Sequence, residues 1–277
     1  AVAAAIFNDP TKVRFVPTNA TERFTALQSG EIDLLARNTT WTLSRDTSLG
    51  FNFTGINYYD GQGFMINAQK LPGINSALQL SGAAICVQTG TTTELNLTDY
   101  FRANGMEYNP VVFEKLEEVN AAYDANRCDV YTTDRSGLAS IRATVAPNPD
   151  DYVILPETIS KEPLGPAVRH GDDEFFDIVK WALYAMIEAE EKGITADNVD
   201  SMLGSDDPTV QRLLGVTPGM GQALGLSEDW AYNIISQVGN YGESFERNVG
   251  SGSPLGLDRG LNGLWTNGGL MYAMPPR

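Results

Sequence analysis

The feature that most constrains the fold of this chain is a repeated alternation of strand-like and helix-like segments. In the first run, a helix is predicted at Glu22–Ser29, between the strand-like segments Val13–Val16 and Ile32–Ala36. Thr21 is expected to cap this helix and Gly30 to end it. The alternation returns in a second run with strands at Ala84–Gln88, Val111–Phe113 and Asp129–Thr132 and helices at Glu94–Asn104 and Glu117–Ala125. This order is typical of α/β proteins with mostly parallel sheets.

Each run ends in a polar cluster that follows a strand. The stretches RFTALQSGEIDLLARNTT and VNAAYDANRCDVYTTDRS both combine an amphipathic helix, a small-residue turn, an Asp-bearing apolar strand and a polar cluster. Open α/β sheets bind ligands just beyond the carboxyl ends of their strands. The sequence therefore predicts two lobes whose polar rims face a shared cleft.

Two extended segments, Gly61–Asn67 and Lys161–Arg169, are expected to connect the lobes. After them, apolar residues at helical spacing predict a long helix at Asp173–Lys192. Later helices are predicted at Pro208–Leu214 and Trp230–Val249. The predicted domains are lobe 1, made of residues 1–64 and 168–277 with a helical extension from about 195, and lobe 2, residues 65–167.

The charge balance excludes several classes of partner. The chain has 19 Lys and Arg against 35 Asp and Glu, a net charge of −16. Nucleic acids and anionic lipid surfaces both select basic proteins. No apolar run approaches the roughly 20 residues of a membrane span. One His and two Cys leave almost no ligands for zinc or a redox cluster, so we expect no metal and no cofactor.

Three polar clusters contain the candidate ligand-binding residues. Residues 37–46 supply hydroxyls, an amide and guanidinium groups, and Arg matches a carboxylate through two parallel hydrogen bonds. Residues 88–94 form a turn into a helix whose first N–H groups make an anion site, with Thr92 or Thr93 as the expected cap. The third cluster, residues 132–136, places Asp134 past a strand end. Each cluster alone is better explained as a capped turn, but together they suit a zwitterionic α-amino acid.

Five segments of the chain closely resemble the general L-amino-acid-binding periplasmic proteins of bacterial ABC importers, in the polar-amino-acid branch of type II solute-binding proteins. The resemblance covers essentially the whole chain and implies a two-lobe type II periplasmic-binding fold with a helical C-terminal extension. It also implies a monomeric periplasmic protein that delivers L-amino acids of broad range to the importer's membrane subunits. The segments are GEIDLLARNTTWTLSRDTSLGFNFT, YYDGQGFMI, CVQTGTTTELNL, NRCDVYTTDRSGL and ISKEPLGPAVRHGDDEFFDIVKWAL.

The resemblance assigns roles to eight positions. Arg45 matches the residue that clamps the ligand's α-carboxylate, and Thr40 matches the hydroxyl residue that contacts the ligand backbone. Thr92 matches the residue whose N–H meets the carboxylate, with Thr91 and Thr93 beside it. The other three matches are Asp134 as partner of the α-ammonium, Asn38 as the carbonyl that accepts from it, and Arg23 as the position that binds a distal carboxylate in acidic-amino-acid binders.

The start of the chain departs from the family's pattern. Family members begin upstream with a first strand, whereas this sequence opens on a helix-like AVAAAIF without a cap. We expect an N-terminally truncated sequence in which the signal peptide and the first strand of lobe 1 are missing.

The two cysteines, Cys86 and Cys128, lie near the starts of the first and third strands of the second run. In a sheet of order 2-1-3 those strands are neighbours, so a disulfide is geometrically possible; two buried free thiols are the alternative. The resemblance to exported proteins favours the bond.

Two other functions compete with solute binding. Related two-lobe folds include dehydratase-type enzymes, and a fold alone does not decide function. An enzyme would need an acid or base facing the reacting carbon, and His170 has no nucleophile or paired carboxylate at suggestive spacing. A ligand-sensing ectodomain would need an attached membrane segment.

Overall fold

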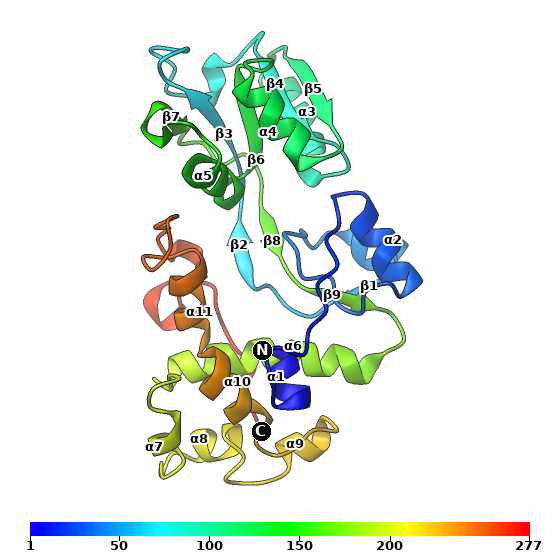
Figure 1. Ribbon diagram of the computed structural model, residues 1–277, viewed down its shortest axis with the longest axis vertical. Helices are drawn as coiled ribbons and strands as arrows, with labels where there is room; N and C mark the ends of the chain where they lie inside the picture. The colour runs from blue at the N-terminus through cyan, green and yellow to red at the C-terminus, as the bar shows by residue number, and fades with distance from the viewer. The chain divides into compact units, whose positions relative to one another are not determined.

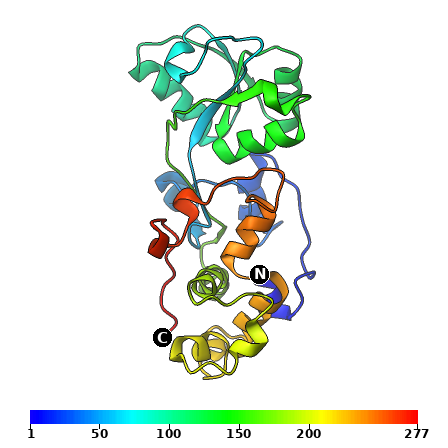
Figure 2. The same cartoon turned by 90° about the vertical axis from the view of Figure 1, so that its left-hand side faces the viewer.

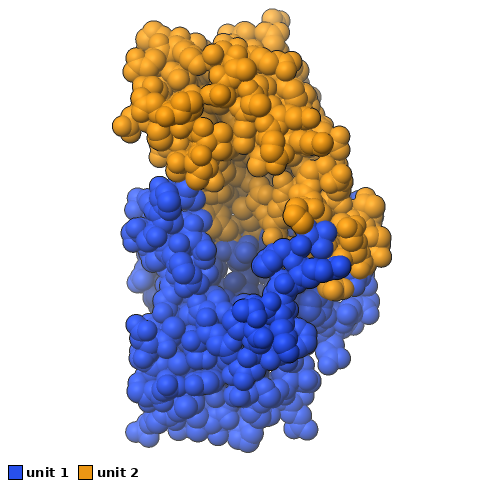
Figure 3. Space-filling view, viewed as in Figure 1, with its two compact units in different colours: residues 1–16, 43–57, 165–277 blue, residues 17–42, 58–164 orange.

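The computed structural model describes all 277 residues, which form two compact units (Figure 3). Unit 1 consists of residues 1–16, 43–57 and 165–277, and unit 2 of residues 17–42 and 58–164. Residues 17–42, which the predicted domains place in lobe 1, group with unit 2. No helix is both long and apolar enough to cross a membrane.

Unit 2 is built on a five-stranded sheet of order β5-β4-β6-β3-β7. Two of its four strand pairs are parallel, since β4 runs parallel to both β5 and β6, while β3 is antiparallel to β6 and β7. The order β5-β4-β6 confirms the predicted 2-1-3 arrangement of the second run. The strands are β3 (Gln62–Asn67), β4 (Ala84–Gln88), β5 (Asn109–Phe113), β6 (Val130–Asp134) and β7 (Tyr152–Ile154).

Three helices cover the two faces of this sheet (Figure 1). The helix α3 (Thr92–Ala103) packs Leu97 and Phe101 on one face, whereas α4 (Leu116–Asp124) and α5 (Arg135–Thr144) cover the other. Alternate residues of β3 enter opposite cores, as the pleat of a strand requires: Phe64 lies on the α3 side and Met65 on the α4 side. Helices therefore cover both faces of the sheet, and the ends of its strands are the places where a binding site can form.

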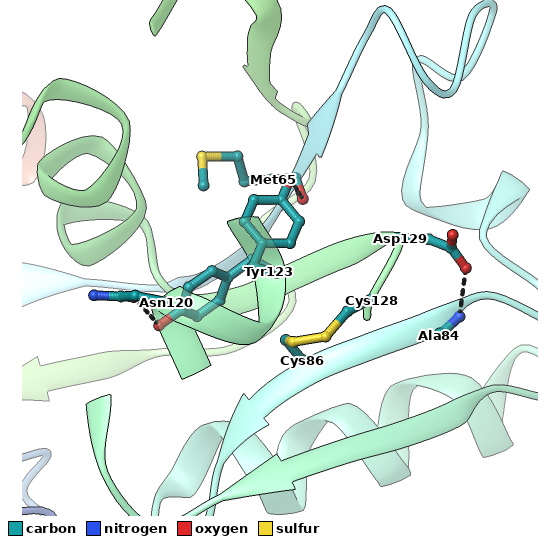
Figure 4. The surroundings of a disulfide bond; sticks show 8 residues. Met65, Ala84, Cys86, Asn120, Tyr123, Cys128 and Asp129 are labelled. Atoms are coloured by element: carbon teal, nitrogen blue, oxygen red, sulfur yellow. Dashed lines mark hydrogen bonds between the residues drawn. A yellow bond between two sulfur atoms is a disulfide. The ribbon is translucent and has the colours of Figure 1, made fainter. Parts of the chain in front are cut away.

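A disulfide joins Cys86 to Cys128 inside unit 2 (Figure 4). Their Cα atoms are 5.5 Å apart, a separation typical of disulfides. Cys86 lies within β4 and Cys128 two residues before the neighbouring β6, and Asp129 Oδ2 accepts a 2.8 Å hydrogen bond from Ala84 N between the same strands. The predicted bond is confirmed.

Unit 1 is centred on the long helix α6 (Asp173–Glu191), which is predicted to within one residue. Figure 2, which looks along α6, shows the later helices around it, and α10 and α11 pack against it directly. A short antiparallel pair, β1 (Phe51–Phe53) with β9 (Ala167–Arg169), completes the unit. The other helices of unit 1 are α1 (Val2–Phe7), α7 (Val199–Met202), α8 (Pro208–Leu213), α9 (Met220–Ala223), α10 (Trp230–Val238) and α11 (Tyr241–Asn248).

The single helix predicted over Trp230–Val249 is wrong, because α10 and α11 are separated at Gly239 and Asn240. Gly239 has a φ of 91°, a conformation that favours glycine. The Asn240 side chain then accepts from Glu243 N at 2.9 Å, and the Glu243 carboxylate accepts from Asn240 N at 2.8 Å. This capping box begins a new helix instead of continuing the old one.

Two predicted strands of the first run, Val13–Val16 and Ile32–Ala36, do not form strands. A strand exists only where a neighbouring strand completes its hydrogen bonds, and neither segment belongs to a sheet. The helix between them, α2 (Glu22–Ser29), is confirmed, and Gly30 ends it with a φ of 80°. Thr21 is its N-cap residue, but the carboxamide oxygen of Asn19 accepts the hydrogen bonds there, from Thr21 N and Glu22 N.

The first predicted connection between lobes is also corrected. Gly61–Asn67 spans the whole of β3 inside the sheet of unit 2, and the chain enters that unit at Tyr58. Lys161–Arg169 does contain a junction, between Leu164 and Gly165. Within unit 2, β2 (Tyr58–Asp60) and β8 (Glu162–Leu164) form an antiparallel pair that extends away from the main sheet.

Candidate functional site

A pocket in unit 2 is lined by seven of the eight residues predicted to bind ligand. They come from α2, from the segment after residue 36, from the start of α3 and from the end of β6. Ala20, Arg37, Gln88 and Thr133 complete the lining. The seven predicted residues are Arg23, Asn38, Thr40, Thr91, Thr92, Thr93 and Asp134.

The eighth predicted residue, Arg45, belongs to unit 1. It lies in a short turn of π-helix, Ser44–Ser48, and is 7% exposed. Its assignment to the ligand carboxylate stays a prediction from the sequence.

The turn before α3 forms one wall of the pocket. Gly90 has a φ of 72°, and a Cβ atom there would lie 2.6 Å from the Thr21 methyl group, so the turn requires glycine. Thr91, and not Thr92 or Thr93, is the N-cap: its Oγ1 accepts from Glu94 N at 3.2 Å and donates to the Gln88 carbonyl at 2.7 Å. The first N–H groups of α3 lack carbonyl partners within the helix and so favour an anion.

The segment of residues 38–41 is held beside this wall by Arg23 and by β8. Arg23 is 3% exposed, and its Nη1 donates to the Asn38 carbonyl at 2.8 Å and to Thr39 Oγ1 at 3.1 Å. Trp41 N donates to the Pro163 carbonyl at 2.8 Å. The Asn38 carbonyl, predicted to accept from an ammonium, thus accepts one bond already and has a second lone pair.

Asp134 is the charged group at the end of β6, and it is 5% exposed. Asn38 Nδ2 donates to its Oδ2 at 3.1 Å. Burial and then the charge of Asp60 raise the pKa of Asp134 to about 7, against the opposing effects of the Asn38 hydrogen bond and of Arg23. A cation placed against this carboxyl would restore its charged form, so the position suits an ammonium group.

Glu162, on β8, is a buried carboxylate behind the pocket that sequence analysis missed. It is 1% exposed, and its Oε2 accepts from Thr92 Oγ1 at 2.8 Å and also from Thr40 Oγ1. Its Oε1 accepts from Asn96 Nδ2 at 2.7 Å and Ser160 Oγ at 2.6 Å. These bonds orient both pocket hydroxyls, and no motif around a lone Glu in a Pro-containing segment signals this role.

A further carboxyl, Asp60 on β2, was also missed. Its Oδ2 accepts from Ser136 N at 3.3 Å and from Ser136 Oγ, and its Oδ1 accepts from Gly61 N at 2.8 Å. Burial raises its pKa in spite of these bonds. Burial, followed by the charges of Asp60 and Asp134, raises the pKa of Tyr58 to about 12. The surroundings of Asp134 therefore carry excess negative potential, which attracts a cation.

Arg37 is the second guanidinium group of the pocket and was not a predicted site residue. Its Nη1 is buried and makes no hydrogen bond. Burial lowers the pKa of Arg37, which the charge of Glu117 partly offsets. The pocket therefore offers an acidic group, two guanidinium groups and a ring of hydroxyls, which together recognise both signs of charge.

Comparison with known proteins gives a consistent result. The model of the bacterial extracellular solute-binding proteins, family 3, matches residues 1–195. The general L-amino acid-binding periplasmic protein AapJ of Rhizobium johnstonii is 66% identical over the whole chain, which covers 81% of that protein. The glutamate/glutamine/aspartate/asparagine-binding protein BztA of Rhodobacter capsulatus is 56% identical, also over the whole chain and 81% of its own length.

A solved structure is similar throughout. It is an ABC transporter periplasmic binding protein from Brucella ovis with glutathione bound, 66% identical to this chain, with a TM-score of 0.98. The match covers 100% of this chain and 86% of the other.

Proposed function

Because this chain belongs to the bacterial extracellular solute-binding proteins of family 3, we propose that it captures free L-amino acids and delivers them to an ABC importer. The observation that carries the proposal is the pocket of unit 2, where buried Asp134 and the N-terminus of α3 line one space. An α-amino acid presents an ammonium and a carboxylate a short distance apart, and these two features complement that pair.

Several pocket residues receive a role in this proposal. Asp134 pairs with the α-ammonium, and the Asn38 carbonyl accepts from it. The N–H groups at the start of α3, that of Thr92 included, bind the α-carboxylate, and Thr40 contacts the ligand backbone. Arg45 is proposed for the same carboxylate on the sequence resemblance alone.

The cellular setting follows from the same family. We place the protein in the periplasm as a monomer that docks on the importer's membrane subunits and needs no cofactor or nucleic acid. The disulfide supports an oxidising compartment, and the net charge of −16 disfavours binding to nucleic acid.

Native mass spectrometry of the purified protein tests the proposal directly. We expect an adduct with the mass of an amino acid that is lost on denaturation, and calorimetric binding of several L-amino acids but not of their D-enantiomers. Glutathione, bound by the Brucella ovis relative, carries the same ammonium and carboxylate and belongs in the same titrations. A protein that binds none of these ligands would overturn the proposal.

A solute-binding protein should leave its ligand unchanged, whereas the dehydratase-type alternative would convert it. NMR spectra of L-amino acids incubated with the protein are therefore expected to stay constant. New resonances that grow with protein concentration would favour the enzyme.

Affinity is expected to fall as the pH falls, by roughly tenfold for each unit below about 7. The pKa of Asp134 in the unliganded protein is raised to about 7, so acid neutralises the carboxyl that must be charged to pair with the ammonium. Calorimetry from pH 8 to pH 5 measures the trend. His170→Gln, which removes the one histidine, is the control and should keep it. A flat profile would show that the ammonium does not meet Asp134.

A further inference from the structure

Arg37 lines the pocket with a guanidinium group whose nitrogen Nη1 has no hydrogen-bonding partner in the protein. Its Nη1 is buried and makes no hydrogen bond, and no ion pair satisfies it. Glu117 acts on it only through its charge. Leaving a charged donor buried without an acceptor costs free energy, and a protein recovers that cost when a ligand supplies the acceptor.

The other guanidinium of the pocket has a different task. Arg23 Nη1 donates to the Asn38 carbonyl and to Thr39 Oγ1, so this residue secures the backbone that bears the ammonium-binding carbonyl. The resemblance to acidic-amino-acid binders nevertheless pointed to Arg23 for a distal carboxylate. Both residues have one buried guanidinium nitrogen without a hydrogen bond, Arg23 Nε and Arg37 Nη1. The difference is that Arg23 Nη1 also holds the backbone of the wall, whereas Arg37 makes no such bond to the protein.

Charge indicates what the missing acceptor is. The charged side chains that line the pocket are Arg23, Arg37 and Asp134, two positive and one negative. Glu162 lies behind the lining and is satisfied by four neutral donors. A ligand with one ammonium and two carboxylates matches this arrangement, because its second carboxylate compensates the second guanidinium.

Building on the proposed function, we propose that Arg37 is a specificity-determining residue that binds the second carboxylate of an acidic ligand. A planar guanidinium binds a carboxylate through two parallel charge-assisted hydrogen bonds, which a neutral amide of the same shape cannot reproduce. The protein thus accepts many L-amino acids but binds amino dicarboxylates most tightly.

Calorimetry with isosteric ligand pairs tests the role of Arg37. In the unaltered protein, L-glutamate should bind more tightly than L-glutamine, and L-aspartate more tightly than L-asparagine. Arg37→Gln should weaken both acidic ligands by about 10- to 100-fold and leave the two amides within about threefold. Arg37→Lys, which keeps the charge but loses the paired geometry, should give an intermediate loss.

Arg102→Gln is the matched control, because it removes the same charge from the surface of α3, where Arg102 pairs with Asp99 at 2.5 Å. It should change none of the four affinities. Equal losses for acids and amides in Arg37→Gln would mean that Arg37 only shapes the pocket, and no loss would mean that it does not meet the ligand. Either result would overturn this inference while leaving amino-acid capture intact, whereas failure of the unaltered protein to bind any of the four ligands would overturn the proposed function itself.

Discussion

Asp134→Ala is expected to weaken the binding of every L-amino acid, whatever its side chain. The ammonium group is common to all of these ligands, and Asp134 is the acidic residue that lines the pocket. Removing one partner of a desolvated charge pair costs on the order of 2–5 kcal/mol. That range corresponds to a loss of affinity of about 30-fold to several thousand-fold, measurable by calorimetry.

Asp134→Asn tests whether ligand binding depends on the charge of residue 134 or only on its shape. The amide preserves the size of the side chain but not its charge, so ligand affinity should fall nearly as far as with alanine. Asp129→Asn is the matched control at the other end of β6, where Asp129 accepts from Ala84 N, and it should leave affinity unchanged. A loss confined to one ligand would show that Asp134 reads side chains and not the ammonium.

Asp134→Asn should lower the affinity for ligand without lowering the stability of the unliganded protein. The raised pKa means that the unliganded folded protein holds a proton on Asp134 more tightly than the unfolded chain does. The free energy of unfolding of the unliganded parent protein therefore decreases as the pH rises from about 4 through 7. At pH 8 the variant should melt no lower than the parent, which distinguishes lost binding from lost folding.

On the sequence alone, Arg45→Ala is also expected to weaken the binding of every L-amino acid, because the α-carboxylate is common to all of these ligands. Arg45 is 7% exposed, so circular dichroism must first establish that the variant folds. Broad loss of binding in a folded variant would support its predicted role, and selective loss would contradict it.

Patterns in the sequence predicted the elements whose ends carry local signals. The helix α2 and the strand β4 match their predicted ranges, because glycine stops and apolar runs mark their ends within a few residues. The break between α10 and α11 also had a local signal, since Asn240 and Glu243 have the spacing of a capping box. A long apolar pattern hid that signal.

Features that depend on contacts between distant segments were harder to predict from the sequence. Val13–Val16 has the composition of a strand, but a ladder needs a partner that composition does not supply. The burial of Glu162 depends on donors from residues 40, 92, 96 and 160, which only the folded chain brings together. Arg37 was part of the candidate cluster of residues 37–46, but nothing in the sequence reveals that its Nη1 is buried without an acceptor.

Reduction of the Cys86–Cys128 disulfide is expected to lower the free energy of unfolding of unit 2 by about 4 kcal/mol. The bond closes a loop with a sequence separation of 42 residues, and in the chain-entropy model this loop restricts the unfolded state. Equilibrium unfolding in urea, with and without a thiol-free reductant, compares the same side chains in both states. On heating, the loss corresponds to a melting point lower by roughly 8–16 °C.

The double variant Cys86→Ala with Cys128→Ala provides the control, since its stability should not respond to the reductant. It should be less stable than the reduced parent, because both thiols are buried against the α4 side of the sheet and their replacement leaves smaller side chains there. Thiol titration of the denatured, unreduced parent should find no free thiol. Two free thiols in that titration would mean that the bond does not form in the protein. Equal stability with and without reductant would mean that the covalent tie between β4 and β6 does not stabilise unit 2 and the pocket at the strand ends.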